Sequence, residues 1–166
     1  MEPKFITDVN VGKLGKWLRL MGYDTLFFDG QDDGLMVKAA IAQGRIILTK
    51  DSEFMKRRAI SKGRVRAILI TSDRPDEQLS TVIEVLKLDK CYRPFTRCLE
   101  CNSLLENRSK HDVQGSVPPR VYDRHDQYMQ CPSCGRIYWK GTHWKAMSGK
   151  LNKLASSGRE NKGEDL

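Results

Sequence analysis

Long apolar runs are absent from this sequence. No stretch approaches the roughly 18 to 20 apolar residues that a bilayer-spanning helix needs, and the charged residues Glu2 and Lys4 stand where a secretory signal begins. A glycine-rich phosphate loop of the usual pattern is also missing, which disfavours an enzyme that acts on a small phosphorylated molecule. These absences predict a soluble, cytoplasmic protein with no membrane partner.

Cysteine is scarce, with five residues among 166. Four of them form two C-x-x-C pairs in the second half of the chain, Cys98 with Cys101 and Cys131 with Cys134. The odd residue, Cys91, argues against a secreted disulfide framework. The two pairs provide the four thiolates of a tetrahedral, structural zinc site with no position left for water. An iron–sulfur centre bound by the same thiolates is the alternative.

The charge balance and the hydrophobic content bound the class of protein. A formal net charge of +8 favours a polyanionic partner such as nucleic acid, although solubility alone explains such a balance equally well. The 39% hydrophobic content allows one ordinary domain and a small second one. The predicted parts are an α/β domain over 1–90, a zinc ribbon over 91–147, and a polar tail over 148–166 that is disordered at its end. The oligomeric state is unknown at this point.

Short apolar runs alternate with helical spacing in the part before residue 90. The runs cover 5–7, 26–28, 46–49 and 68–71, and each has the composition of a strand covered on both faces. The helical segments cover 14–21, 35–41, 54–60 and 75–86, the first three followed by Gly22, Gly44 and Gly63. This alternation predicts an α/β fold with a mostly parallel sheet. By contrast, residues 107–126, with Pro118 and Pro119, predict an exposed loop.

Acidic residues lie where such a fold places its active site. Asp8 and Asp51 follow apolar runs at the carboxyl ends of predicted strands, where open parallel sheets bind their ligands. Asp32 and Asp33 open the second predicted helix, and Glu53 lies two residues beyond Asp51. Adjacent carboxylates repel unless a cation lies between them, and hard oxygen ligands favour Mg²⁺ or Mn²⁺. The alternative for each single acid is a helix N-cap, which stabilises by about 1 kcal/mol.

A dense basic segment lies next to this proposed metal site. Its members are Lys50, Lys56, Arg57, Arg58, Lys62, Arg64 and Arg66. Such a cluster neutralises phosphates regardless of their sequence, and Lys50, Arg57 and Arg58 are its candidate substrate-binding residues. The alternative is a solvated helix face.

Aromatic residues flank the second cysteine pair. Lys140, close to Trp144 in sequence, is a candidate for binding single-stranded nucleic acid together with stacked bases. For Tyr138 and Trp139 we instead predict a place in the compact core of the ribbon, which is too small to fold without metal.

Several blocks of residues, in a fixed order from about residue 4 to residue 147, together form a pattern that resembles a known family. The first holds Asp8, Gly12, Leu14, Gly15, Trp17, Leu18, Arg19, Leu20, Gly22, Tyr23, Asp24 and Thr25. The next holds Asp32, Asp33, Ala40, Gly44, Arg45, Ile46, Leu48, Thr49, Asp51 and, further on, Gln78. The last are Arg97 to Asn102, Cys131 to Gly135, and Tyr138 to His143. In this order the blocks resemble the Mut-seven C-terminal ribonuclease domain family, a branch of the PIN-like nucleases.

The resemblance implies a PIN-like three-layer domain with a mostly parallel sheet, a zinc ribbon after it, and metal-dependent cleavage of RNA. It implies that Asp8, Asp33 and Asp51 are the acidic cluster that holds Mg²⁺ or Mn²⁺. Asp32 is the alternative to Asp33 as the metal-binding acid at the start of the second predicted helix, and Asp33 is preferred. Glu53 is a further candidate for the acidic cluster.

Two functions of different classes remain open. The first is a metal-dependent ribonuclease, with single-stranded RNA as the expected partner. The second is a non-catalytic nucleic-acid-binding module that uses the zinc ribbon and a basic face. In the second, the acids serve only as helix caps. Convergence of Asp8, Asp33 and Asp51 in the fold distinguishes the two.

Overall fold

The structure is a computed structural model that describes residues 1–89 and 92–157. These residues fall into two compact units, the first Met1–Asn102 and the second beginning at Ser103. The predicted boundary after residue 90 lies outside the described residues, as does Cys91, and the first unit includes 92–102. The predicted domain limits therefore stay a prediction.

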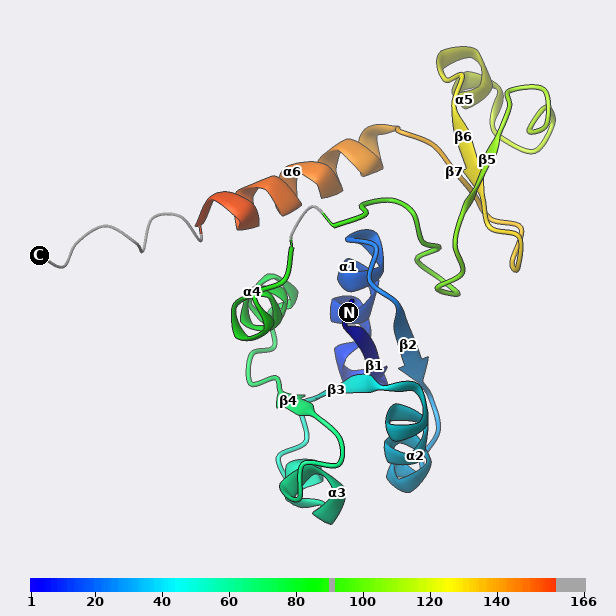
Figure 1. Cartoon of the computed structure of the whole chain (residues 1–166). Coiled ribbons are helices and arrows are strands. Elements are labelled where there is room, and N and C mark those ends of the chain that lie inside the picture. Colours follow the sequence, from blue (N-terminus) through cyan, green and yellow to red (C-terminus); the bar gives the residue numbers. More distant parts are fainter. Residues whose placement is uncertain (90–91, 158–166) are drawn as a thin grey trace, which may run out of the picture. The chain divides into compact units, whose positions relative to one another are not determined.

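Four strands of the first unit form one parallel sheet (Figure 1). They are β1 (Lys4–Asp8), β2 (Thr25–Phe28), β3 (Arg45–Thr49) and β4 (Ala67–Leu69). Their order is β2-β1-β3-β4, and Ile6 is in register with Leu26 on one side and Ile47 on the other. The predicted α/β fold with a mostly parallel sheet is confirmed.

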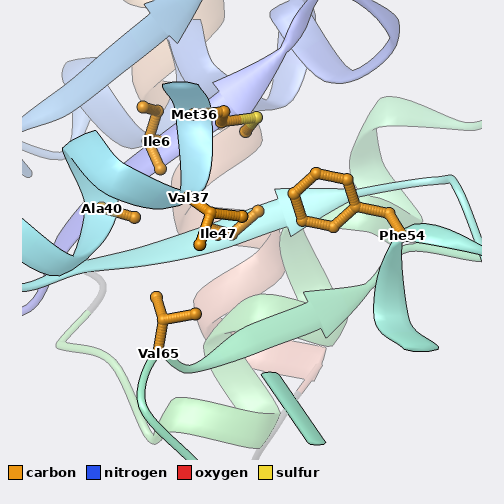
Figure 2. Close-up of a cluster of buried hydrophobic side chains, with 7 residues drawn as sticks. All are labelled: Ile6, Met36, Val37, Ala40, Ile47, Phe54 and Val65. Atoms are coloured by element: carbon orange, nitrogen blue, oxygen red, sulfur yellow. The ribbon is translucent and has the colours of Figure 1, made fainter. Parts of the chain in front are cut away.

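Helices cover both faces of this sheet. They are α1 (Gly12–Leu20), α2 (Asp33–Gln43), α3 (Arg58–Ser61) and α4 (Pro75–Leu86), with the 3₁₀ turns η1 (Val9–Val11) and η2 (Phe54–Lys56). Ile6 and Ile47 pack against Met36 and Val37 of α2 (Figure 2). Their neighbours along the strands face the other way because strand side chains alternate, and α1 and α4 lie together there (Figure 1). The result is the three-layer arrangement expected from the sequence.

Local signals set the limits of two of these helices. Asp32 caps α2, its Oδ1 accepting a hydrogen bond from Gly34 N at 2.8 Å. Gly44 ends α2 with a φ of 62°, a left-handed conformation that glycine adopts without strain. Pro75 is the first residue of α4, where its missing N–H removes no helical bond.

The third predicted helix is broken in two. Arg57, with an extended ψ of 138°, separates η2 from α3. Phe54 on one side of the break is buried in the core, whereas the Arg57 guanidinium lies 5.3 Å from its ring centroid and reaches Asp33. The prediction of one helix over 54–60 is therefore wrong, because contacts distant in sequence fix the backbone at Arg57.

The segment after α4 returns to the end of α1. Arg93 N donates to Met21 O at 3.0 Å, and Phe95 N donates to Leu20 O at 2.9 Å. Gly22 has a φ of 96°, and a Cβ placed there would lie 2.3 Å from Arg93 O. Only glycine fits a position that is both left-handed and this close to another backbone.

The second unit contains a three-stranded antiparallel sheet in the order β5-β6-β7 (Figure 1). Its elements are β5 (Glu106–Arg108), α5 (Pro119–Arg124), β6 (Tyr128–Gln130), β7 (Ile137–Tyr138) and α6 (Thr142–Ser157). A small core is formed by Val113, Val117 and Tyr128, and Trp139 packs against it as predicted.

Two predictions for the second unit are corrected. Residues 107–126 are not simply an exposed loop, since they contribute Val113, Val117 and α5 to this core, and the Tyr128 hydroxyl donates to Val121 O at 3.1 Å. The part of the predicted polar tail up to Ser157 is helical, as the end of α6. The sequence predicted disorder beyond Leu154, but residues 155–157 are helical, and the rest of that stretch, 158–166, lies outside the described residues. None of the helices in 1–89 and 92–157 has the length and apolar character to span a membrane.

Candidate functional site

The order of the parallel strands reverses between β1 and β3. From β1 the chain continues to β2 on one side, and β3 lies on the other side of β1. Open parallel sheets bind ligands outside the carboxyl ends of their strands at such a reversal. Asp8 is the last residue of β1, and Asp51 follows two residues after Thr49, the end of β3. The structure therefore places these two predicted site residues on neighbouring strands at the same edge.

A buried threonine links these two acids. The Thr49 hydroxyl donates to Asp8 Oδ2 at 2.9 Å and accepts from Asp51 N at 3.1 Å, and Thr49 is only 1% exposed. The other oxygen of Asp8 accepts from Asn10 N at 2.9 Å, and Asp51 Oδ1 accepts from Glu53 N at 2.9 Å. Both carboxylates thus have one oxygen engaged in a turn, and the Thr49 hydroxyl orients the second oxygen of Asp8.

Asp32 and Asp33 have different roles. Asp32 is the N-cap of α2, and its carboxylate bonds the backbone of that helix. Asp33 lies within the first turn of α2 and accepts a hydrogen bond from Arg57 Nη2 at Oδ2, with a distance of 3.0 Å. Both side chains of this ion pair are nearly half exposed, so the pair itself adds little stability. Asp33 is the acid of the two that is not used for capping.

The other predicted residues around this edge form exposed ion pairs. Glu53 Oε1 accepts from Lys56 Nζ at 2.7 Å, and Lys50 pairs with Asp73. Arg58 is the first residue of α3 and is exposed. The basic segment is therefore accessible to a polyanion, but Lys50, Lys56 and Arg57 already have acidic neighbours.

The acids are not gathered as tightly as the cysteines. Among residues 1–89 and 92–157, the group of three or more His, Cys, Asp or Glu close enough to hold one ion consists of Cys98, Cys101, Cys131 and Cys134. Asp8, Asp33 and Asp51 do not form a second such group in the described residues, and the carboxylate of Asp33 is turned to Arg57. The structure places Asp8 and Asp51 at the same strand edge, with Thr49 bonded to the Asp8 carboxylate and to the Asp51 backbone, whereas the Asp33 carboxylate bonds Arg57.

The four cysteines fit a zinc ion. Their sulfur atoms all lie within 4.8 Å of one another, and none of the four is in a disulfide. Sulfurs bound to one zinc at about 2.3 Å lie roughly 3.8 Å apart in a tetrahedron, so a small closure completes the site. The four-cysteine group is compatible with the predicted zinc ribbon and can bind zinc.

Each cysteine pair is shaped by a turn that ends in a left-handed residue. Gly135 N donates to Cys131 O at 2.9 Å with a φ of 75°, and Asn102 N donates to Cys98 O at 3.0 Å with a φ of 68°. Cys134 N also donates to Cys131 Sγ at 3.4 Å, the type of N–H bond that stabilises a thiolate. The predicted turn at Gly135 is confirmed.

Buried charges lie beside the first cysteine pair. Burial lowers the pKa of the Arg19 guanidinium, while the thiolates of Cys98 and Cys101 raise it. Burial raises the pKa of Asp24, but hydrogen bonds from Arg45 and Asn102 outweigh that effect and leave the pKa below its ordinary value. Both groups thus remain charged and balanced by neighbours of opposite sign.

In the second unit, Lys140 Nζ lies 5.2 Å from the centroid of the Trp144 ring. A cation over an aromatic face is a geometry that also suits an RNA base and its phosphate. The alternative to a role in RNA binding is that Lys140 and Trp144 only form a local contact within the unit.

The fold and the site define an α/β protein with acids at the carboxyl end of a parallel sheet and a four-cysteine group. A sequence model of the family described as the Mut7-C RNAse domain matches residues 3–151. The chain therefore belongs to this family, as its resemblance indicated, and the family description indicates a ribonuclease-like function with RNA as substrate. No curated protein and no solved structure matches the chain.

Thr49 is the residue of this site that the sequence reasoning did not single out. Its position at the end of an apolar run, two residues before Asp51, was a usable signal. A hydroxyl at a buried strand position needs a partner, and the nearest candidates are the acids at the same edge.

Proposed function

We propose that this protein is a metal-dependent ribonuclease that hydrolyses phosphodiester bonds of RNA, with single-stranded RNA as the preferred substrate. The observation that carries the proposal is the pair of acids at the strand-order reversal, Asp8 and Asp51, where the Thr49 hydroxyl bonds the Asp8 carboxylate and the Asp51 backbone N–H. Membership in a family described by an RNase domain supports it.

In this proposal Asp8, Asp33 and Asp51 hold Mg²⁺ or Mn²⁺, with Asp32 and Glu53 as lesser candidates. A bound ion of this type activates water and stabilises the charge that develops on the phosphate. The side chains fit this donor set only in part as they stand, because Asp33 is paired with Arg57. Since that pair is exposed and weak, its exchange for a contact with a metal costs little.

The proposed phosphate-binding residues are Lys50, Arg57 and Arg58 in the first unit and Lys140 in the second. Arg57 is of particular interest because the same guanidinium that now pairs with Asp33 is able to bind a phosphate in a bidentate way. Contacts of this kind release counterions, so the affinity for RNA should fall steeply as salt is added. Zinc on the four cysteines has a structural role, and thiolate-bound zinc suits the reducing cytoplasm, which we propose as the location.

The proposal is tested by cleavage of short single-stranded and duplex RNA with Mg²⁺ or Mn²⁺. Asp51→Asn should reduce the cleavage rate on the order of a thousandfold, because it removes a charge from the proposed metal site. Glu84→Gln is the matched control, since Glu84 is an exposed acid in the last turn of α4, away from the carboxyl ends of the strands. Equal activity of wild type and Asp51→Asn, after removal of contaminating nuclease, would overturn the assignment.

The second candidate is a nucleic-acid-binding module that does not cut. The observation that favours it is that Asp8, Asp33 and Asp51 are not gathered in one group within the described residues. RNA binding that depends on salt, with no cleavage under any metal and with Asp51→Asn as active in binding as wild type, would select it.

A further inference from the structure

The two cysteine turns have the same backbone but end in different residues. In both, the residue after the second cysteine is left-handed and its N–H bonds the carbonyl of the first cysteine, at 3.0 Å for Asn102 and 2.9 Å for Gly135. Glycine is the residue that adopts this conformation without cost. Asparagine tolerates it less well, so the side chain of Asn102 calls for its own explanation.

That side chain is buried at the amino end of β2. Asn102 is 7% exposed; its Oδ1 accepts from Thr25 N at 3.0 Å and its Nδ2 donates to Asp24 Oδ1 at 2.7 Å. The carbonyl of Asn102 accepts from Arg97 Nη1 at 2.9 Å, and Arg97 Nε donates to Gly22 O at 3.0 Å. A residue of the cysteine turn thus completes the hydrogen bonding of the edge strand.

A buried arginine makes a second connection. Arg19 of α1 is 3% exposed; its Nη1 donates to Leu99 O at 2.9 Å and its Nε donates to Thr25 O at 2.8 Å. Leu99 lies between Cys98 and Cys101. The guanidinium therefore holds the inside of the cysteine turn and the start of β2 together.

The bonds continue across the sheet. Arg45, the first residue of β3, pairs with Asp24 through both terminal nitrogens, at 2.7 and 3.2 Å, and also donates to Phe5 O in β1 at 3.1 Å. We call Arg19, Asp24, Thr25, Arg45 and Asn102 the amino-end network. It joins the first cysteine turn to the amino ends of β1, β2 and β3.

We propose that zinc binding stabilises the amino end of the parallel sheet. Asn102 and Arg19 are the positioning residues that couple the zinc site to the strands. The physical reason is that a metal site is rarely preformed, so the free energy of metal binding also stabilises the fold around the ligands. Zinc on Cys98 and Cys101 fixes the turn, and the fixed turn presents the Asn102 amide and the Leu99 carbonyl to their partners. Zinc thereby stabilises the α/β unit itself, in addition to the second unit.

Because coupling between two equilibria is reciprocal, the network must also strengthen zinc binding. Removal of the Asn102 side chain should weaken the retention of zinc, although no atom of that side chain is a ligand. A residue that only stabilises the fold has no reason to change zinc affinity in a protein that stays folded. The proposal does not depend on nuclease activity, so it can fail or hold independently of the proposed function.

The first test uses hydrogen exchange on the full chain, with zinc bound and after its removal by a chelator. The reporter is the amide of Thr25, which donates to Asn102 Oδ1, and the reference is the amide of Ile70, which donates to Thr49 O at 2.7 Å. We expect exchange at Thr25 to become at least about tenfold faster when zinc is removed. An unchanged Thr25 amide, with faster exchange confined to residues after Ser103, overturns the proposal.

The second test makes the first turn resemble the second. Asn102→Gly keeps the left-handed backbone and removes only the side-chain bonds, and Asn107→Gly is the control, since Asn107 is exposed in β5. Zinc transfer to a chromophoric chelator should be about tenfold more favourable from Asn102→Gly than from wild type or the control. Equal zinc retention by all three proteins overturns the coupling. If Asn102→Gly does not fold, the exchange experiment on the wild type still decides.

Discussion

The two ends of the parallel sheet differ in how far their charged side chains are buried and in how many hydrogen bonds those side chains make. At the amino end, Arg45 and Asp24 are 6% and 21% exposed, form a two-point ion pair, and have further hydrogen bonds to Asn102 and Phe5. At the carboxyl end, Asp33 is 46% exposed in its pair with Arg57. Buried, fully bonded charges hold a structure in one arrangement, whereas exposed, singly paired charges can change partners. The comparison shows that the charges at the amino end, the closed end, are fixed by internal bonds. Those at the carboxyl end, the open end, are available for ligands.

The largest effect expected is on stability, at the closed end. Gly22→Ala should lower the free energy of unfolding by about 3 kcal/mol or more, because it adds left-handed strain to an overlap with Arg93 O at 2.3 Å. Gly63→Ala is the matched control: its φ is also positive, at 70°, but nothing lies within 4 Å of the added Cβ, so only about 1 kcal/mol should be lost. Urea denaturation measures both. Similar losses for the two variants would show that the return of the chain past Gly22 is not tight.

The next effect is on activity, at the open end. Asp33→Asn should slow RNA cleavage on the order of a hundredfold with the fold intact, if Asp33 is the metal-binding acid of the pair. Asp32→Asn should keep activity, since asparagine caps a helix as well as aspartate does. Cleavage rates and thermal unfolding of the two variants give the answer. The reverse pattern, with Asp32→Asn inactive, would assign the role to Asp32.

A smaller effect is expected where the two acids meet. Thr49→Val removes the hydroxyl that bonds Asp8 Oδ2 and Asp51 N, and should reduce cleavage about tenfold. Thr49→Ser retains a hydroxyl and should recover most of the activity. The dependence of the rate on Mn²⁺ concentration separates the roles: a shifted midpoint indicates an altered metal site. If valine and serine behave alike, the hydroxyl does not position Asp8.

The smallest effect is a pH dependence at the closed end. The pKa of Asp24 lies below its ordinary value of 3.8 in the folded protein. Its contribution to stability is therefore present above the unfolded value and is lost as the pH falls through the folded pKa. When the pH is lowered from about 4, the free energy of unfolding of Asp24→Asn should fall less than that of wild type, as measured by urea unfolding. Zinc content is measured at each pH in both proteins, because Asp24 bonds Asn102 in the amino-end network, and parallel pH curves at equal zinc content would contradict the prediction.

The sequence was informative where structure is decided locally. Short apolar runs, the stop at Gly44 and the start at Pro75 predicted the strands and most helix limits, because these signals act within a few residues. The break at Arg57 was missed because it depends on contacts with Phe54 and Asp33. Likewise, α5 is too short for helical periodicity to reveal, and its packing against Tyr128 requires the fold.

The candidate site was predictable to a similar degree. Strand ends located Asp8 and Asp51, since the carboxyl ends of parallel strands share an edge. Two C-x-x-C pairs located the four-cysteine group. The amino-end network was not predictable, because Thr25 and Asn102 are 77 positions apart and the place of Asn102 after Cys101 does not reveal which distant residue it bonds.

The distance along the chain between Asn102 and Thr25 has a consequence for folding during synthesis. Domains fold as units once their residues have been made, and contacts between distant residues form late. The four strands are complete after Leu69, yet the edge strand lacks the partner of Thr25 until Asn102 has emerged. The amino end of the nascent sheet therefore stays without this hydrogen bond while more than a quarter of the unit's residues are still to be synthesised. A chain that ends before the first cysteine pair lacks Asn102 and cannot form the bond.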